Sequence, residues 1–408
     1  MQPVEPAAIP DEASRHYPGW RVVALCFVTA TFGWGLGFYG HSVYLAELQR
    51  LHGWPSSLIA SATTMFYLVG ALMVAFISEA MRALGVRVCL LLGVACMAIA
   101  ALLLGQITSP WQLYAVYFLM AFGWAGTSLG AITTTLGLWF NKRRGMAISL
   151  ALNGASCGGI VGVPLLVAAI GQFGFSHAVM LAAALTVLVL VPMIFWCVGT
   201  PPADRTLVNA AAPPSSGRIR AEALQTVAFR TVTIAFSLML FAQVGFIVHL
   251  ISFLDPIVGR EHAAVAISIM TAMAVVGRVL FSTVIDRLDQ RLASALSFLS
   301  QALALLLIIN TSDVRLIYLA SAVFGFSVGN LITLPALIVQ REFPPYAFGV
   351  LISLVTAVSQ VVYSMGPGAI GFLRDLSGSY VVPFATCIAL QLVAAALVLV
   401  RGRPAPTV

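Results

Sequence analysis

The chain has 408 residues, of which 60% are hydrophobic and only 9% are charged, and its formal net charge is +7. A soluble protein of this length carries more polar surface, so this composition, with a mean hydropathy of +1.00, predicts an all-α polytopic membrane protein. The basic residues do not cluster on one element, so the charge predicts no nucleic-acid partner. We expect it to report membrane topology instead.

The polar N-terminal segment, residues 1–19, has no basic start followed by an apolar core, so we expect a tail and no cleavable signal peptide. Twelve apolar runs follow, each long enough to cross a bilayer as a helix. Strands are not expected, because the runs lack alternation and an open sheet leaves its backbone unsatisfied in lipid. The runs cover residues 20–44, 56–78, 86–107, 111–138, 146–170, 176–198, 229–254, 262–285, 292–310, 315–338, 347–370 and 381–400.

The basic residues between the runs and at their ends are strongly asymmetric when the N-terminus is placed in the cytoplasm. This bias predicts that both termini are cytoplasmic, with an even number of spans in an inner or plasma membrane. The cytoplasmic set has sixteen members, Arg15, Arg21, Arg82, Arg87, Lys142, Arg143, Arg144, Arg205, Arg218, Arg220, Arg230, Arg287, Arg291, Arg341, Arg401 and Arg403. The external set has four, Arg50, Arg260, Arg315 and Arg374.

The longest interior stretch that is not apolar follows the sixth run and is rich in Pro, Ala and Ser. We interpret it as a cytoplasmic linker between two six-helix halves. The halves also resemble each other, because NKRRGMAISLALNGASCGG and REFPPYAFGVLISLVTAVSQ each place a charged turn before a helix start with small residues. Two related halves with a midplane site between them are typical of transporters. The expected division is a bundle at 20–199, the linker at 200–228, a bundle at 229–400 and a cytoplasmic tail at 401–408.

Several local patterns resemble the major facilitator superfamily. GRVLFSTVIDRLDQR is similar to the superfamily's loop motif after the second helix of a half, whereas FISEAMRALGVRV keeps only part of it and has Arg82 at the acidic position. The resemblance implies a gating loop in which the acid holds cytoplasmic helix ends together across the halves. The matching positions are Asp286, Arg287 and Arg291 in the second half, and Gly85 and Arg87 in the first.

Four longer stretches resemble the monocarboxylate transporter and oxalate:formate antiporter branch of that superfamily. They are YPGWRVVALCF, HGWPSSLIA, LWFNKRRGMAISLALNGASCGG and GPGAIGFLRDLSGSY. In that branch an arginine of helix eight is expected to bind the substrate carboxylate, and Arg278, followed by VLFSTVIDR, matches its position. FIVHLISFLDP resembles the helix-seven stretch of bacterial members, which places His249 beside the transport pathway.

Arg278 also stands out on physical grounds, because a buried arginine near a helix centre costs about 2.5–3.5 kcal/mol on insertion scales. The alternatives to a binding role are snorkelling towards water and a structural ion pair, but no acid in the spans lies obviously at the same depth. A guanidinium stays protonated and holds a carboxylate through two parallel hydrogen bonds. The eleventh span contains no lysine or arginine, so a single cation favours a monocarboxylate over a dianion.

Proton coupling is expected because it makes entry of a monoanion electroneutral. His249 is the candidate carrier, with a neutral hydrogen-bonding role as the alternative. Asp255 is a second carrier candidate, or else a solvated helix-end acid. Further polar residues either line the site or join helices by hydrogen bonds, and they are Tyr114, Tyr117, Asn153, Asn330, Gln360 and Tyr363. His41, near the outer end of the first run, is expected at the interface.

The sequence thus predicts a secondary transporter that carries a small monocarboxylate with protons by alternating access, as a monomer in the lipid bilayer. An oxalate:formate type of exchanger and a multidrug efflux carrier are the alternatives. No metal-binding spacing or cofactor motif is present, and no HExxH or GxSxG motif indicates an enzyme.

Overall fold

The computed structural model describes residues 12, 14, 17–140, 142–199, 216–282, 288–331, 333–344 and 347–401. Its ordered elements are helices, and the predicted all-helical membrane fold is confirmed. Eleven helices in this part of the chain are long and apolar enough to cross a membrane, and Val314–Val328 is a shorter apolar helix in the place of the tenth predicted run.

The helices before residue 200 are here called the N-terminal group. They are α1 (Gly19–Trp34), the π-helix η1 (Gly35–Tyr39), α2 (Gly40–His52), α3 (Ser56–Ala75), α4 (Ile77–Leu84), α5 (Val86–Leu104), α6 (Pro110–Thr127), α7 (Leu129–Trp139), α8 (Arg144–Cys157), the π-helix η2 (Gly158–Gly162), α9 (Val163–Phe173) and α10 (Phe175–Cys197). Local sequence explains their ends. For example, Ser109 and Gln112 form a capping box with Pro110 in the first turn of α6, and Gly53 ends α2 at a φ of 65°.

The helices after residue 226 are called the C-terminal group. They are α12 (Val227–Val258), α13 (Arg260–Ser282), α14 (Gln290–Ile309), α15 (Val314–Val328), α16 (Leu334–Glu342), α17 (Phe348–Ser364), α18 (Gly366–Ser377) and α19 (Val381–Leu399). The described part of the predicted linker includes a further helix, α11 (Ser216–Gln225). The Thr226 hydroxyl accepts from the Phe229 backbone N–H at 3.3 Å and so caps α12 directly after it.

Two predicted spans differ from the structure. The first was expected to end at residue 44, but α1, η1 and α2 form one run of helix from Gly19 to His52. The extra turns place Glu47 inside a membrane span, where its side chain is fully buried. The tenth span was expected to be continuous over 315–338, but it is interrupted between α15 and α16.

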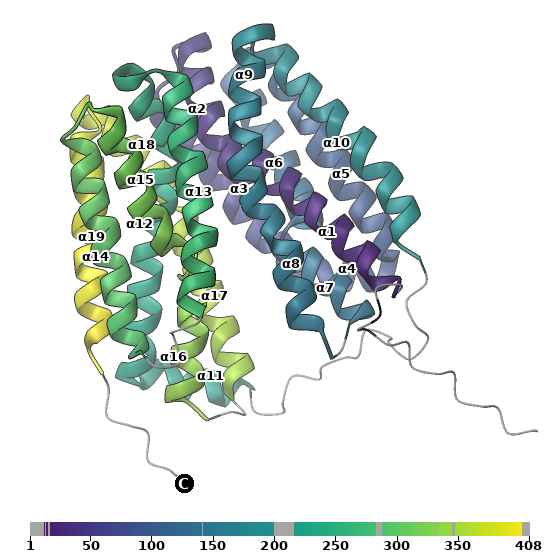
Figure 1. Cartoon of the computed structure of the whole chain (residues 1–408), viewed down its shortest axis with the longest axis vertical. Coiled ribbons are helices and arrows are strands. Elements are labelled where there is room, and N and C mark those ends of the chain that lie inside the picture. Colours follow the sequence, from purple (N-terminus) through teal and green to yellow (C-terminus); the bar gives the residue numbers. More distant parts are fainter. Residues whose placement is uncertain are drawn as a thin grey trace, which may run out of the picture.

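The two groups stand next to each other, and they lie closest at one end (Figure 1). We call this the distal end, and it contains the end of α2 and the start of α13. The opposite, proximal end contains α4, α11 and α16. Contacts between the groups join α3 to α18, α2 to α12, and η2 and α9 to α13.

One arginine in each group ties together the corresponding helices. Arg87, at the start of α5, donates to the Val198 carbonyl oxygen just after α10. Arg291, at the start of α14, donates to the carbonyl oxygens of Val398 (2.7 Å) and Val400 (3.0 Å) at the end of α19. Equivalent bonds at equivalent helix ends are what two structurally related halves would produce.

The predicted gating-loop residues are only partly described. Gly85 ends α4 at a φ of 86°, a conformation that favours glycine, whereas Asp286 and Arg287 lie outside the described residues. Arg291 is buried, and its guanidinium forms a two-pronged ion pair with Glu342 of α16 at 2.5 and 2.7 Å. All the recorded bonds of Arg291 therefore stay within the C-terminal group.

Candidate functional site

Arg278 lies in the proximal part of α13 and is partly buried. The helix is held tightly against α15, because small residues allow the two backbones to touch. A Cβ atom added at Gly277 would overlap the Phe326 carbonyl oxygen, and one added at Gly329 would overlap the Ala274 carbonyl oxygen. The Cβ of Arg278 is 3.3 Å from that same added atom at Gly329, so this packing fixes where the arginine emerges.

The interruption of the tenth span lies next to Arg278. After α15 ends at Val328, residues 329–331 and 333 form turns, and α16 begins at Leu334. Asn330, in this break, is 2% exposed, and its Nδ2 donates to the Phe326 carbonyl oxygen at 3.3 Å. The fourth span is broken too, because Ser128 adopts an extended ψ of −177° between α6 and α7. Paired breaks in corresponding helices of the two halves are typical of substrate sites in transporters.

Tyr39 brings the N-terminal group to the same place. It ends the π-helix η1, is 8% exposed, and its hydroxyl lies beside Thr271 of α13 and within electrostatic range of Arg278. Our sequence analysis missed Tyr39. The available signal was the glycine-rich segment TFGWGLGFYG, since π-helical turns within α-helices are frequent at functional sites.

No hydrogen bond or ion pair joins Arg278 to another side chain in the part of the chain that the structure describes. Glu47, the fully buried acid of the first span, pairs instead with Arg50 (2.8 Å) and Arg260 near the distal end. Arg260 also pairs with Asp255 at 3.1 Å. Asp255 is therefore an ion-paired residue rather than a freely solvated helix-end acid.

His249 is fully buried in α12, and its two ring nitrogens both have partners. Nε2 donates to the Pro367 carbonyl oxygen at 3.0 Å, and Nδ1 lies 3.1 Å from the Tyr380 hydroxyl. In the neutral ring, Nδ1 accepts from Tyr380, whereas in the protonated ring the same hydroxyl becomes the acceptor. This arrangement satisfies either protonation state, and it joins α12, α18 and the start of α19.

The predicted tyrosines of the fourth span have different surroundings. The Tyr114 hydroxyl lies 2.6 Å from the Ser61 hydroxyl, which is an interhelical bond between α6 and α3. The Tyr117 ring is fully buried, 5.1 Å from the His41 ring, and among the described residues its hydroxyl has no hydrogen-bond partner of acceptable geometry. His41 itself is fully buried, so its expected interfacial position is wrong. The continuation of helix from α1 through α2 brings it into the core of the N-terminal group.

The remaining predicted lining residues lie on α8, which contacts α13, and on α17, which packs against α12 and α3. Tyr363 of α17 is partly buried, and its ring lies 6.0 Å from the Tyr67 ring of α3, so this pair crosses between the groups. Asn153 of α8 and Gln360 of α17 are partly buried. The structure thus brings Tyr39 close to Arg278 and places Asn330 in the adjacent break, where it bonds to Phe326, whereas Tyr114 and His249 hydrogen-bond elsewhere.

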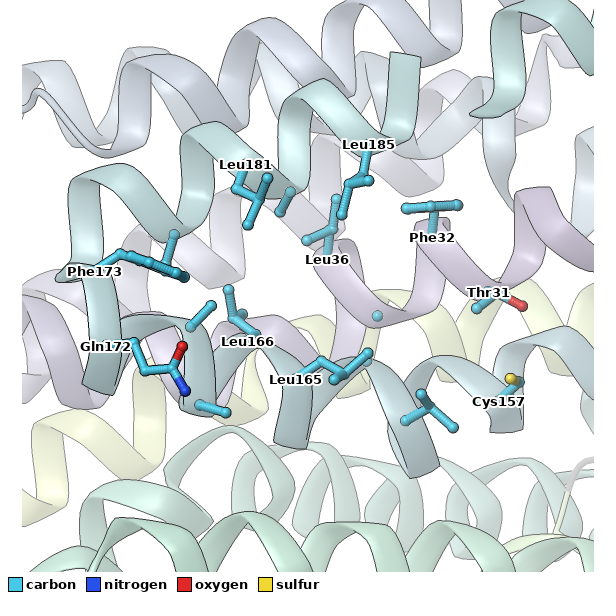
Figure 2. A pocket seen from close by; sticks show the side chains of 17 residues that line it. Thr31, Phe32, Leu36, Cys157, Leu165, Leu166, Gln172, Phe173, Leu181 and Leu185 are labelled. Carbon is cyan, nitrogen blue, oxygen red and sulfur yellow. The ribbon is translucent and has the colours of Figure 1, made fainter. Parts of the chain in front are cut away.

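A large cavity of about 480 Å³ lies elsewhere, between α1, η1, η2, α9 and α10. Figure 2 shows its walls, where apolar side chains such as Leu36, Leu166 and Leu181 face one another, with Thr31 and Gln172 towards its two ends. Several lining side chains are exposed on the surface of the molecule, and Leu165, for example, is 64% exposed. No lysine or arginine side chain lines this cavity, so it offers no positive charge to bind an anion. We therefore place the candidate site at Arg278.

Known proteins support this architecture. The chain is 33% identical over 156 residues to the "Uncharacterized transporter ESBP6" of Saccharomyces cerevisiae, a match that covers 35% of this chain and 22% of that protein. It is 25% identical over 266 residues to the "Aspyridones efflux protein apdF" of Emericella nidulans, covering 62% of this chain and 51% of that one. The chain thus spans about half or less of these relatives.

Two solved structures share the fold at 14% identity. A bacterial homologue of the human lysosomal transporter Spinster, inward-facing and occupied, has a TM-score of 0.73, covering 94% of this chain and 97% of that one. The nucleoside transporter NupG has a TM-score of 0.74, covering 94% and 100%. The family model described as Major Facilitator Superfamily matches residues 23–367. The chain therefore belongs to the Major Facilitator Superfamily and is a multi-pass membrane transporter.

Proposed function

We propose that the protein carries a small monocarboxylate together with a proton, and that Arg278 binds the carboxylate group. The observation that carries the proposal is the position of Arg278. A permanent cation lies inside a membrane helix, beside the break in the tenth span, with no acidic partner among the described residues. A cation held in this way needs a counterion, and an incoming carboxylate supplies one with two matching acceptor oxygens.

The charge balance favours one negative charge on the substrate. Helices α17 and α18 carry no lysine, and Arg374, near the end of α18, is directed to Asp375 at 3.3 Å. A second carboxylate near Arg278 would thus lack a cation of its own. Tyr39, across from Arg278, adds a hydroxyl group from the other half, so the site would close around a small acid when the halves meet.

Proton coupling is the second part of the proposal, with His249 as the carrier. The Pro367 carbonyl oxygen and the Tyr380 hydroxyl accept hydrogen bonds from both nitrogens of a charged ring. Protonation would then require only rotation of the Tyr380 O–H group. We expect His249→Gln to flatten the pH dependence of uptake, while His262→Gln, at an exposed histidine of α13, leaves it unchanged. A pH profile that His249→Gln does not alter would assign the proton elsewhere.

Topology completes the proposal. Because basic residues are in excess on that side, we expect the proximal end and both termini to face the cytoplasm, with the protein in a cell inner or plasma membrane. The halves are proposed as rigid bundles, 20–199 and 229–400, joined by the linker at 200–228, in a carrier that works as a monomer. With this orientation the closed distal end faces outside, so the conformation is inward-facing.

The decisive test replaces the planar guanidinium with a point charge. Arg278→Lys should retain the fold but lose bidentate binding, and the apparent KM for lactate or pyruvate in proteoliposomes should rise by about tenfold or more. The matched control is Arg315→Lys, at an exposed arginine of α15, which should transport normally. Normal uptake by a folded Arg278→Lys protein would refute the carboxylate assignment.

The substrate class needs a separate measurement. Unlabelled lactate, pyruvate, oxalate and succinate would compete for uptake at two external pH values, and monoanions should compete best. Strong competition by oxalate, with uptake that ignores the proton gradient, would favour an oxalate:formate type of exchanger.

A second candidate function is efflux, which the similarity to the apdF efflux protein favours. Efflux of an organic acid would use the same arginine, but in the opposite direction. Loading vesicles with the acid and following its loss separates export from uptake. Extrusion of cationic dyes that Arg278→Lys leaves unchanged would favour a multidrug carrier.

A further inference from the structure

The cavity between α1, η1, η2, α9 and α10 is separate from the candidate site at Arg278, and its walls are almost entirely apolar. Glycines form part of the wall, because Gly35 and Gly162 both line it, and a Cβ atom added at Gly162 would lie 3.7 Å from the Gly35 Cα. Helices that approach through glycine backbones carry no side chains to fill the space beside them. The resulting volume of about 480 Å³ is that of a ligand pocket, for which roughly 300–1,000 Å³ is usual.

The cavity is open on the outer surface of α9 and α10, both of which belong to membrane-spanning helices. Leu165 of α9 is 64% exposed, and Leu181 and Leu185 of α10 are 44% and 46% exposed, although all three line the cavity. Large apolar side chains exposed within a membrane span face the hydrocarbon of the bilayer. The cavity is therefore continuous with the lipid-facing surface of the protein.

The lining is long, because it follows one face of a continuous helical run from α8 through η2 to α9. Cys157, Val161, Leu165, Ala168 and Gln172 all line the cavity and recur every three or four residues. The run from the first to the last of them extends about 22 Å at 1.5 Å per residue, which is more than one leaflet of a hydrocarbon core about 30 Å thick. A long apolar space suits a hydrocarbon chain better than a compact molecule.

The few polar groups of the lining disfavour water and favour a lipid tail. The Thr31 hydroxyl already donates to the Phe27 carbonyl oxygen at 3.0 Å, whereas an ordered water needs about two to four polar partners. Gln172 lies at the other end of the cavity (Figure 2) and is exposed beside the turn between α9 and α10, as is His177. This turn is at the distal end (Figure 1). A lipid whose head group lies at this polar turn can therefore extend its tail into the cavity towards Thr31.

We propose that the cavity binds one acyl chain of a phospholipid from the bilayer leaflet on the distal side. The chain lies against Leu36 of η1 and Leu166 of α9, where it supplies the apolar contacts that an open void lacks. It also supports the wall that faces the C-terminal group, because the Ser268 hydroxyl of α13 donates to the Ile160 carbonyl oxygen of η2 at 2.9 Å. The bound lipid is thus a structural ligand of the N-terminal group.

Photo-crosslinking of the full chain in detergent-free vesicles tests the proposal. The probe is a phosphatidylethanolamine whose acyl chain carries a diazirine, diluted into phosphatidylethanolamine and phosphatidylglycerol, and mass spectrometry of peptides locates the adducts. Leu36 and Leu166 are only 7% and 6% exposed, so we expect a chain to reach them from within the cavity. Leu188 of α10, which is 70% exposed and outside the lining, reports ordinary surface lipid. Adducts at Leu36 and Leu166 are expected, and labelling confined to exposed positions such as Leu188 would refute the proposal.

Filling the cavity provides the matched comparison. Ala182→Phe places a ring inside it from α10, and adducts at Leu36, relative to those at Leu188, should fall by about tenfold or more, because the ring takes the space of several methylene groups. Ala184→Phe, at an exposed alanine of the same helix outside the lining, should leave this ratio unchanged. If Ala182→Phe does not fold, Ala169→Phe fills the cavity from α9 and decides the same question.

A free fatty acid that carries the same diazirine chain is the second probe, and it distinguishes a bilayer phospholipid from a soluble acid. Labelling of Leu36 by the free acid but not by the phospholipid would assign the cavity to a different occupant and overturn the proposal. An adduct ratio that a folded filling variant does not lower would overturn it too. The measurement uses no transported substrate, so failure of the carboxylate assignment leaves this result unaffected.

Discussion

The contact between α13 and α15 sets the position of Arg278, and Gly329→Ala tests it. At this residue φ is −61°, so alanine adopts the backbone conformation without strain. The obstacle is space alone, because the new Cβ would overlap the Ala274 carbonyl oxygen and lie 3.3 Å from the Cβ of Arg278. Both neighbours belong to α13, and a backbone carbonyl cannot rotate away as the end of a side chain can.

The expected magnitude follows from this overlap. Forcing one methyl group into a close-packed contact typically costs about 1–3 kcal/mol. The helices must separate to admit it, and a displacement of about 1 Å at a positioning group costs up to about 100-fold in rate. We therefore expect Gly329→Ala to lower the free energy of unfolding by about 1–3 kcal/mol and to raise the KM for the transported acid by about tenfold.

The assay is thermal unfolding in detergent, followed by initial-rate uptake in proteoliposomes. Gly349→Ala is the matched control, because it lies in the first turn of α17 and its added Cβ has no heavy atom within 4 Å. That substitution should be neutral or stabilise by about 0.5–1 kcal/mol through the lower conformational entropy of the unfolded chain. If Gly329→Ala is as stable as Gly349→Ala and transports with an unchanged KM, the packing of α13 on α15 does not position Arg278.

Two further predictions concern the proximal end. Glu342→Gln removes the acid that pairs with the buried Arg291 guanidinium at 2.5 and 2.7 Å, so the free energy of unfolding should fall by about 1.5–3 kcal/mol. Thermal unfolding measures this change. The control Glu261→Gln, at an exposed acid of α13, should change thermal unfolding little. The Leu292 backbone N–H and the Arg401 guanidinium hold the pKa of Asp289 below its usual value of 3.8, so the stability that Asp289 contributes is complete above that pH and is lost as the pH falls below it. Asp289→Ala should therefore destabilise the protein by about 1 kcal/mol at pH 7, with a smaller difference from wild type at pH 3, and an equal difference at both pH values would contradict this assignment.

The membrane fold could be predicted because hydropathy acts over whole helices. Runs of about 20 apolar residues satisfy their backbone only as helices in lipid, so the spans follow from composition without any knowledge of packing. Arg278 was recognisable for a related reason, since a charge in such a run is costly and stands out against its neighbours. What surrounds Arg278 was not recognisable. Tyr39 lies 239 positions earlier in the chain, and the two residues come close only because η1 and α13 approach each other from different groups.

Glu47 shows most clearly why the sequence alone was insufficient. The window that found the first span ended at residue 44, because Glu47, Gln49, Arg50 and His52 lower the local hydropathy. In the structure the helix continues past all four residues, and the carboxylate is buried because Arg260 neutralises it from another helix. A hydropathy scale gives each residue the free energy of transfer that it has in isolation. The free energy of burying a charged side chain depends instead on the partner that it pairs with. Residues that hold the halves of a carrier together are polar and paired across an interface, so a search for apolar spans tends to assign them to loops.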